Sequence, residues 1–182
     1  MSSSDANPRV LTISLYQDNW YPPERGYIEH RGEAAGDGTA INVPLPPGSG
    51  VGAYRAAFEQ VVIPKVRAFA PEVIFVASGF DASAFDPLGR MMMISAGYAD
   101  LTRQLMDVAG EVSGGRLVMA HEGGYSPTYV PFCGLAVLET MNGVPSGVDD
   151  PYLAFAAGMG CQSLQPAQQQ VIDAVKAAHG MS

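Results

Sequence analysis

The segment Val73-Ile-Phe-Val-Ala-Ser78 decides the fold class of this chain. It is a short run of apolar and β-branched residues, which is typical of a strand buried on both faces. The polar turn Gly79-Phe80-Asp81 follows it directly. Two other segments have the same character, Val10-Leu-Thr-Ile-Ser-Leu-Tyr16 and Arg116-Leu-Val-Met-Ala120. The sequence therefore predicts several buried strands, with a shorter one over 40–43 before a Pro-rich stop.

Helical patterns separate these strands. Val51 to Phe69 has apolar residues near helical spacing, and Pro64 is expected to interrupt or kink that helix. Ser95 is a plausible N-cap for a helix that runs to about Val112. Further helices are expected over 129–141 and in the tail, the last near 166–178. Strands that alternate with helices predict an α/β fold with a parallel sheet covered on both sides.

Composition excludes several classes of protein. The 182 residues are 47% hydrophobic and 15% charged, which fits one globular domain over residues 1–182. No apolar run approaches a membrane span, and no secretory signal is visible, so a cytoplasmic location is the default. The net charge is −8 and the ten Lys and Arg residues are scattered, which argues against nucleic-acid binding.

Two strands end on polar, glycine-containing turns, Gly79-Phe80-Asp81 and Glu122-Gly-Gly-Tyr125. Because ligands bind at the carboxyl ends of parallel strands, both turns are expected at one functional rim. Asp81 follows a buried strand, so it is either a turn residue or a carboxylate with a partner or a metal. Tyr125 is either a packed turn residue or a hydroxyl placed to stabilise an oxyanion. The pattern alone leaves both alternatives open.

The histidines and cysteines form no recognisable motif. His30, His121 and His179 are far apart in the sequence, and His179 is expected to be solvated near the C-terminus. The two cysteines, Cys133 and Cys161, fit no zinc spacing and are interpreted as ordinary thiols. A catalytic zinc site generally has three protein ligands, and these residues do not supply such a set.

An ordered series of short motifs resembles the histone deacetylase and acetylpolyamine amidohydrolase superfamily, with the closest likeness to bacterial class II deacetylase-like amidohydrolases. The likeness covers about residues 7 to 165. The motifs that carry it are Val10-Leu-Thr-Ile-Ser-Leu15, Asn42-Val-Pro-Leu-Pro-Pro-Gly-Ser-Gly50, Ser78-Gly-Phe-Asp-Ala-Ser83, Asp86-Pro-Leu-Gly89, Glu122-Gly-Gly-Tyr-Ser-Pro127, Pro131-Phe-Cys-Gly-Leu-Ala136, Asp150-Pro-Tyr152 and Ala157-Gly-Met-Gly160.

The resemblance implies an arginase-like parallel sheet flanked by helices. It also implies zinc-dependent hydrolysis of an acetyl amide in an acetylated lysine peptide or polyamine. The residues carried over are Asp81 as a zinc ligand, Tyr125 as the catalytic tyrosine that stabilises the oxyanion, and Tyr21, Leu88, Gly123 and Gly124 as the substrate channel.

The chain also departs from the family pattern. The Asp-x-His zinc motif and the tandem-histidine base are absent, as is the N-terminal half of the fold, and Tyr16 stands where the family often has histidine. The isolated chain is therefore expected to be nearly inactive. Three readings stay open: a fragment completed by an N-terminal half, a degenerate homologue acting as an oligomer or interaction module, and, less favoured, an unrelated α/β small-molecule binder.

Overall fold

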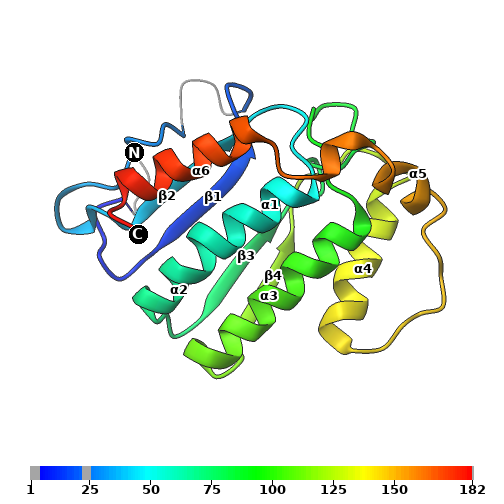
Figure 1. Ribbon diagram of the computed structural model, residues 1–182. Coiled ribbons are helices and arrows are strands. Elements are labelled where there is room, and N and C mark those ends of the chain that lie inside the picture. Colours follow the sequence, from blue (N-terminus) through cyan, green and yellow to red (C-terminus); the bar gives the residue numbers. More distant parts are fainter. Residues whose placement is uncertain (1–4, 22–25, 182) are drawn as a thin grey trace.

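The computed structural model describes residues 5–21 and 26–181, and its strands form two parallel pairs (Figure 1). Strand β1 (Thr12–Gln17) pairs with β2 (Ala40–Leu45), from Thr12 opposite Ala40 to Gln17 opposite Leu45. Strand β3 (Ile74–Ser78) pairs with β4 (Leu117–His121), from Ile74 opposite Leu117 to Ser78 opposite His121. The predicted α/β class with parallel strands flanked by helices is confirmed.

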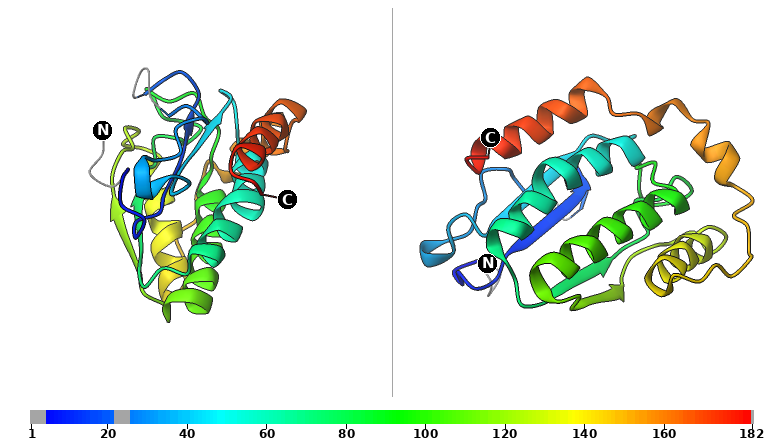
Figure 2. Two further views of the ribbon diagram at one scale, coloured as in Figure 1. Left: turned by 90° about the vertical axis from the view of Figure 1, so that its left-hand side faces the viewer. Right: turned by 60° about the horizontal axis from the view of Figure 1, so that its bottom comes forward.

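A layer of helices covers one face of the strands (Figures 1 and 2). Helix α6 packs on β2 and on α1, α1 and α2 pack on α3, and α3 packs on β4 and α4. The elements are α1 (Val51–Ala57), the π-helical η2 (Phe58–Val62), α2 (Ile63–Phe69), α3 (Ser95–Ser113), α4 (Val130–Asn142), α5 (Leu153–Ala157) and α6 (Pro166–Ala178), with short 3₁₀ turns η1 (Ala34–Gly36) and η3 (Gly160–Gln162).

The core lies between the strands and this helix layer. In β2, Ile41, Val43 and Leu45 are each at most 1% exposed. Ile13 and Leu15 of β1 pack against the same core but are only partly buried. Burial of these alternate apolar side chains stabilises the packing of the strands against the helices.

The second face of the β3–β4 pair is open, which differs from the expected sheet covered on both sides. Phe75 is 74% exposed and Val118 is 48% exposed. The two residues are register partners, so they form one apolar patch. The apolar run of β3 correctly predicts a strand, but within the described residues only the helix-facing side of that strand is covered.

The expected helix over 51–69 is continuous in spite of Pro64. A π-helical turn, Phe58–Val62, leads directly into α2, whose first turn contains Pro64. Proline lacks an N–H and collides with the carbonyl of the preceding turn of an α-helix. A wider π turn relieves that collision, so the chain keeps its direction instead of breaking.

Two local predictions are wrong. Ser95 is the first residue of α3 rather than its N-cap, which is the extended residue Ile94, and the Ser95 hydroxyl lies 2.5 Å from Asp150 Oδ2. His179 is 7% exposed rather than solvated. It lies at the end of α6, where Arg31 donates to the Ala178 carbonyl and Lys65 to the His179 carbonyl.

Within residues 5–21 and 26–181, no helix combines the length and the apolar character that crossing a membrane requires. Both cysteines are free thiols. The assignment of residues 1–182 to a single domain stays a prediction.

Candidate functional site

The turns that follow β3 and β4 are hydrogen-bonded to each other at one rim of the molecule. The Phe80 amide donates to the Gly123 carbonyl at 2.6 Å, and the Glu122 amide donates to the Ser78 carbonyl at 3.2 Å. These bonds extend the β3–β4 ladder beyond its last strand residues. The expectation that the two turns share a rim is therefore met by direct contacts.

The carboxylate of Asp81 lies against two glycines. A Cβ atom added to Gly79 would lie 2.6 Å from Asp81 Oδ1, and one added to Gly123 would lie 2.8 Å from Asp81 Cγ. Both distances are shorter than real Cβ contacts, so the carboxylate can take this position only beside glycine. Asp81 is exposed, contrary to the expectation that it follows a strand into a buried position. Among the described residues, none donates a hydrogen bond to the Asp81 carboxylate.

Asp86 organises the rim, and sequence reasoning assigned it no role. It is 8% exposed, and its Oδ1 accepts hydrogen bonds from the Leu88 and Gly89 amides at 2.8 and 3.0 Å. Its Oδ2 accepts from the Tyr125 amide at 2.7 Å. One carboxylate thus fixes both the Asp-Pro-Leu-Gly turn and the backbone of Tyr125. An aspartate whose side chain accepts a hydrogen bond from the amide two residues later is a common turn pattern. This pattern could have indicated the structural role of Asp86 from the sequence.

The backbone before Tyr125 requires glycine. Gly124 has φ +135°, and an added Cβ would lie 3.0 Å from Phe80 Cβ and from Val130 Cγ2. The Tyr125 side chain is 53% exposed, so its hydroxyl is free to meet a ligand. Leu88, also predicted to contact substrate, is 54% exposed on the neighbouring turn.

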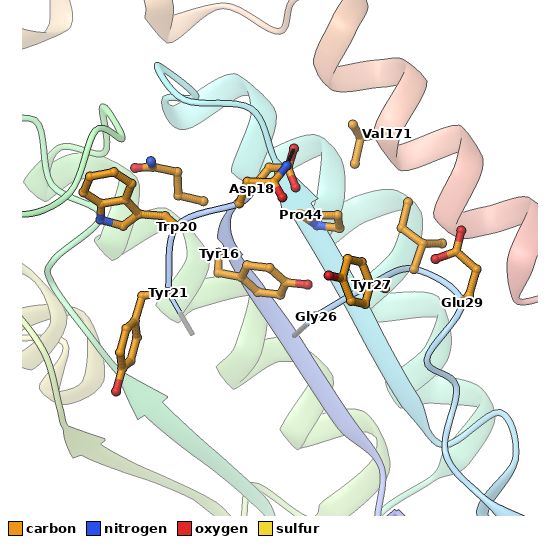
Figure 3. A pocket seen from close by; sticks show the side chains of 12 residues that line it. Tyr16, Asp18, Trp20, Tyr21, Gly26, Tyr27, Glu29, Pro44 and Val171 are labelled. Carbon is orange, nitrogen blue, oxygen red and sulfur yellow. Dashed lines mark hydrogen bonds between the residues drawn. The ribbon is translucent and has the colours of Figure 1, made fainter. Parts of the chain in front are cut away.

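Tyr21 belongs to a different hollow from the other predicted site residues. It lines a cavity of about 260 Å³ together with Tyr16, Trp20 and Tyr27, at the carboxyl ends of β1 and β2. Figure 3 shows that its side chain points away from Tyr16 and Tyr27. This cavity does not include the residues after β3 and β4.

The segment that carries Tyr21 is nevertheless tied to the Asp86 turn. The Arg90 amide donates to Gln17 Oε1 at 2.8 Å, and the Arg90 guanidinium lies 5.7 Å from the centre of the Trp20 ring. The residues predicted to form the substrate channel therefore lie in two places. Leu88, Gly123 and Gly124 lie on the rim turns, and Tyr21 lies at the neighbouring cavity.

Buried phenols and a thiol lie behind the rim. Burial, and secondarily the Asp81 carboxylate, raises the pKa of Tyr54. Burial likewise raises the pKa of Tyr98, whose hydroxyl has no hydrogen-bond partner among the described residues. Burial and then Asp150 raise the pKa of Cys133 to about 12. Because burial raises these pKa values, the phenols and the thiol stay neutral near pH 7.

The described residues do not fit a zinc ion. They contain no group of three or more His, Cys, Asp or Glu side chains that could hold a metal. A zinc site generally needs three protein ligands, and Asp81 offers one carboxylate. His121, the nearest histidine in sequence, is exposed and lies against the Phe80 ring, with ring centres 5.2 Å apart. No catalytic step through zinc can therefore be assigned to these residues alone.

Comparison with known sequences identifies relatives for most of the chain. Residues 2–141 match the histone deacetylase domain. The histone deacetylase-like amidohydrolase of Pseudomonas aeruginosa is 51% identical over 146 residues, which cover 80% of this chain and 38% of the relative. Histone deacetylase 8 of Arabidopsis thaliana is 40% identical over 150 residues, or 80% of this chain and 39% of the relative. The chain thus spans about two fifths of these relatives.

Solved structures show the same placement of elements. The crystal structure of the HDA15 HD domain matches with a TM-score of 0.82 at 29% identity, covering 97% of this chain and 45% of that one. The structure of the histone deacetylase Clr3 matches with a TM-score of 0.82 at 30% identity, covering 97% of this chain and 28% of that one. Sequence and structure agree, and the chain belongs to the histone deacetylase domain family.

Proposed function

We propose that this chain supplies one part of the hydrolytic site of a zinc-dependent deacetylase-like amidohydrolase. The observation that carries the proposal is the joined rim, where the Asp81 carboxylate lies against Gly79 and Gly123 and the Tyr125 amide donates to Asp86. In this proposal, the remaining ligands and the general base come from outside residues 5–21 and 26–181.

Each residue has a chemical part in the proposal. Gly79 and Gly123 leave space for the Asp81 carboxylate beside the Tyr125 turn, where it would serve as one ligand of the metal. The Tyr125 phenol donates a hydrogen bond to the oxygen that becomes negative when water attacks an amide carbonyl. Asp86 positions Tyr125 through its backbone rather than touching the substrate.

The substrate class follows from the family and from charge. Acetylated lysine peptides and acetylated polyamines both carry a linear apolar chain that ends in an amide. The chain has a net charge of −8, which favours approach of such cationic molecules. Leu88 and Tyr21 offer exposed apolar surface to the methylene chain.

The test is deacetylase activity on an acetyl-lysine reporter, with zinc or a chelator. The chain would be assayed alone and fused, in the relative's order, to the part of the Pseudomonas amidohydrolase that it does not match. We expect the chain alone to be nearly inactive and the fusion to be active only with zinc. Asp81→Ala should abolish that activity, and Tyr125→Phe should lower kcat by about 10²–10³-fold.

Tyr27→Phe is the matched control for the tyrosine variant, because Tyr27 is also exposed, at 56%, but lies at the other cavity. Its activity should equal that of the unmodified fusion. A folded fusion without zinc-dependent activity would refute the proposal.

A second candidate is a non-catalytic homologue that acts as an oligomer or interaction module. The exposed pair Phe75 and Val118 favours it, because an apolar patch on a sheet face suits a protein contact. Zinc-dependent activity of the fusion that requires Asp81 would exclude this candidate.

A further inference from the structure

The cavity at the carboxyl ends of β1 and β2 is separate from the proposed hydrolytic site. Its volume is about 260 Å³, and its lining does not include the turns that carry Asp81 and Tyr125. Ligand pockets for drug-sized molecules typically measure about 300–1,000 Å³. A hollow of this size therefore suits a small chemical group rather than a large molecule.

Aromatic rings form much of the cavity lining. Figure 3 shows that the side chains of Tyr16 and Tyr27 point toward each other, whereas Tyr21 points away from both. The face of an aromatic ring carries negative charge density and attracts a cation placed over it. Trp20, which also lines the cavity, already makes such a contact, because the Arg90 guanidinium lies 5.7 Å from the centre of its ring.

That contact is the only cation–π pair within residues 5–21 and 26–181. The rings of Tyr16 and Tyr27 therefore have no cation from the described part of the chain over their faces.

The charged side chains that line the cavity are acidic. Asp18 and Glu29 contribute carboxylates, and no described Lys, Arg or His lines the cavity. Neither carboxylate forms an ion pair with a described residue, and Asp18 accepts a hydrogen bond only from the neutral side-chain amide of Asn19, at 2.9 Å. Burial first, and the Asp18 carboxylate second, raise the pKa of Tyr16 to about 12. The negative charge of Asp18 thus acts on a ring that lines the cavity.

Apolar groups complete the lining. Pro44 of β2 is the register partner of Tyr16, and Val171 reaches the cavity from α6. Gly26 has φ +78°, and a side chain there would collide with the Tyr16 hydroxyl. A primary ammonium has three N–H groups that need acceptors, whereas a fully methylated ammonium has none. Rings, apolar groups and two carboxylates together suit a methylated ammonium, which is apolar on its outside and positively charged.

Hydrogen bonds fix both ends of the segment that forms the cavity. The Asp18 amide donates to the Leu45 carbonyl at 2.9 Å, which holds the start of the segment on β2. The Asn42 side chain donates to the Tyr27 carbonyl at 3.3 Å and to the His30 carbonyl at 3.1 Å, which holds its end on the same strand. A site whose walls are held in place before binding loses less conformational entropy when a ligand binds.

We infer that this cavity is a binding site for a methylated ammonium group, of the kind carried by choline or by a trimethylated lysine side chain. The Tyr16 and Tyr27 rings contact the methyl groups, and the Asp18 and Glu29 carboxylates balance the positive charge. Aromatic cages bind quaternary ammonium ligands through the same attraction. The site does not share the chemistry of the rim, so this inference does not depend on the proposed hydrolysis.

The first test is binding of choline to the chain, measured by isothermal titration calorimetry and by the fluorescence of Trp20. Trp20 is the only tryptophan in the sequence and lines the cavity, so bound choline should change its emission. Dimethylbutanol, the uncharged isostere of choline, and ethanolamine, which has a primary ammonium, should each bind at least about tenfold more weakly. Equal binding of choline and dimethylbutanol would overturn the inference, as would the absence of choline binding at millimolar concentration.

Variants of one ring test the aromatic contact. Tyr27→Leu should weaken choline binding about tenfold, whereas Tyr27→Phe keeps the ring and should bind choline nearly as well as the unmodified chain. Tyr27 is 56% exposed, so both variants should stay folded, which a thermal melt checks. Phe75→Leu is the matched control, because Phe75 is an exposed aromatic residue outside the cavity. Equal choline affinity of Tyr27→Leu and Phe75→Leu would contradict the inference.

Variants of the carboxylates test the charge. Asp18→Asn and Glu29→Gln should each weaken choline binding about threefold to tenfold and leave dimethylbutanol binding unchanged. Asp107→Asn on α3 is the control, because it makes the same change in net charge outside the cavity. If all three variants bind choline equally, the charge of the cavity plays no part and the inference is wrong.

A short peptide with one trimethylated lysine identifies the source of the group. The peptide should bind at least about tenfold more tightly than the same peptide with unmodified lysine, and equal binding of the two peptides would count against the inference. Tighter binding of the trimethylated peptide than of choline would assign the cavity to a protein partner, and the reverse to a free small molecule. None of these measurements needs zinc or deacetylase activity, so this inference and the proposed function can fail independently.

Discussion

At the scale of single residues, the rim depends on one buried carboxylate and a few glycines. Asp86 accepts three backbone hydrogen bonds, and Gly79, Gly123 and Gly124 allow chain segments to approach where a side chain would collide. Of these residues, the sequence predicted Gly123 and Gly124 as channel residues and placed Gly79 only in a rim turn, and it gave Asp86 no role. Their roles depend on contacts between turns that are far apart in sequence, which the motif Asp86-Pro-Leu-Gly89 does not reveal by itself.

Asp86→Ala should destabilise the chain by about 2–4 kcal/mol, because it leaves the partly buried amides of Leu88, Gly89 and Tyr125 without an acceptor. Urea denaturation measures the change. Asp107→Ala is the control: this exposed aspartate on α3 should change stability by less than about 0.5 kcal/mol. Equal stability of the two variants would contradict the role given to Asp86.

Gly89→Ala should also destabilise the chain, because the new Cβ would lie 2.2 Å from the Asp81 carbonyl oxygen, which is backbone and cannot rotate away. We expect a loss of about 1–3 kcal/mol in thermal or urea unfolding. Gly110→Ala on α3 meets no atom within 4 Å and should instead stabilise by about 0.5–1 kcal/mol. The prediction fails if both alanines change stability in the same direction.

At the scale of elements, the local sequence pattern correctly predicted helices and strands wherever contacts with distant segments did not change them. The helix over 166–178 is found as expected, because its proline start and amphipathic spacing are local features. The apolar run at 74–78 predicts β3, but not the exposure of Phe75, since a strand does not encode what covers its second face. Ser95 was assigned as an N-cap because its real partner, Asp150, lies far along the chain.

His179 links the docking of α6 to pH. Burial first, then Lys65 and Arg31, lower its pKa below the usual 6.5, and Asp37 opposes them weakly. The unfolded chain therefore binds the proton more readily than the folded chain, so stability is full above about pH 6.5 and falls as pH drops below it. One such group contributes a slope of at most about 1.4 kcal/mol per pH unit.

Urea denaturation between pH 7.5 and 5.5 tests this link. His179→Asn should reduce the loss of stability over that range relative to the unmodified chain. His121→Asn is the control, since His121 is exposed and forms no ion pair among the described residues. An unchanged pH dependence in the His179 variant would show that other groups set it.

At the scale of the whole molecule, helices cover one face of the strands, whereas the opposite face of the β3–β4 pair is exposed. The helix-facing side of the strands packs into a continuous core, whereas the opposite side exposes Phe75 and Val118.

Phe75→Lys should therefore reduce concentration-dependent association in light scattering at little cost in stability, because the side chain is already 74% exposed. Leu138→Lys, at 57% exposure on α4, is the control and should have less effect. Equal association of both variants would mean that the patch is not the contact surface.

The parallel arrangement of the strands has a consequence for how the chain folds. The two strands of each pair are joined by a long connection: the segment with η1 lies between β1 and β2, and α3 lies between β3 and β4. Neither pair can form until its connection has been synthesised. Such distant pairings must lose loop entropy before they gain contacts, and they slow folding. During synthesis, neither turn of the rim can be fixed until β4 and Tyr125 have left the ribosome, so the hydrogen bonds that join the two turns form only after most of the strands have been made.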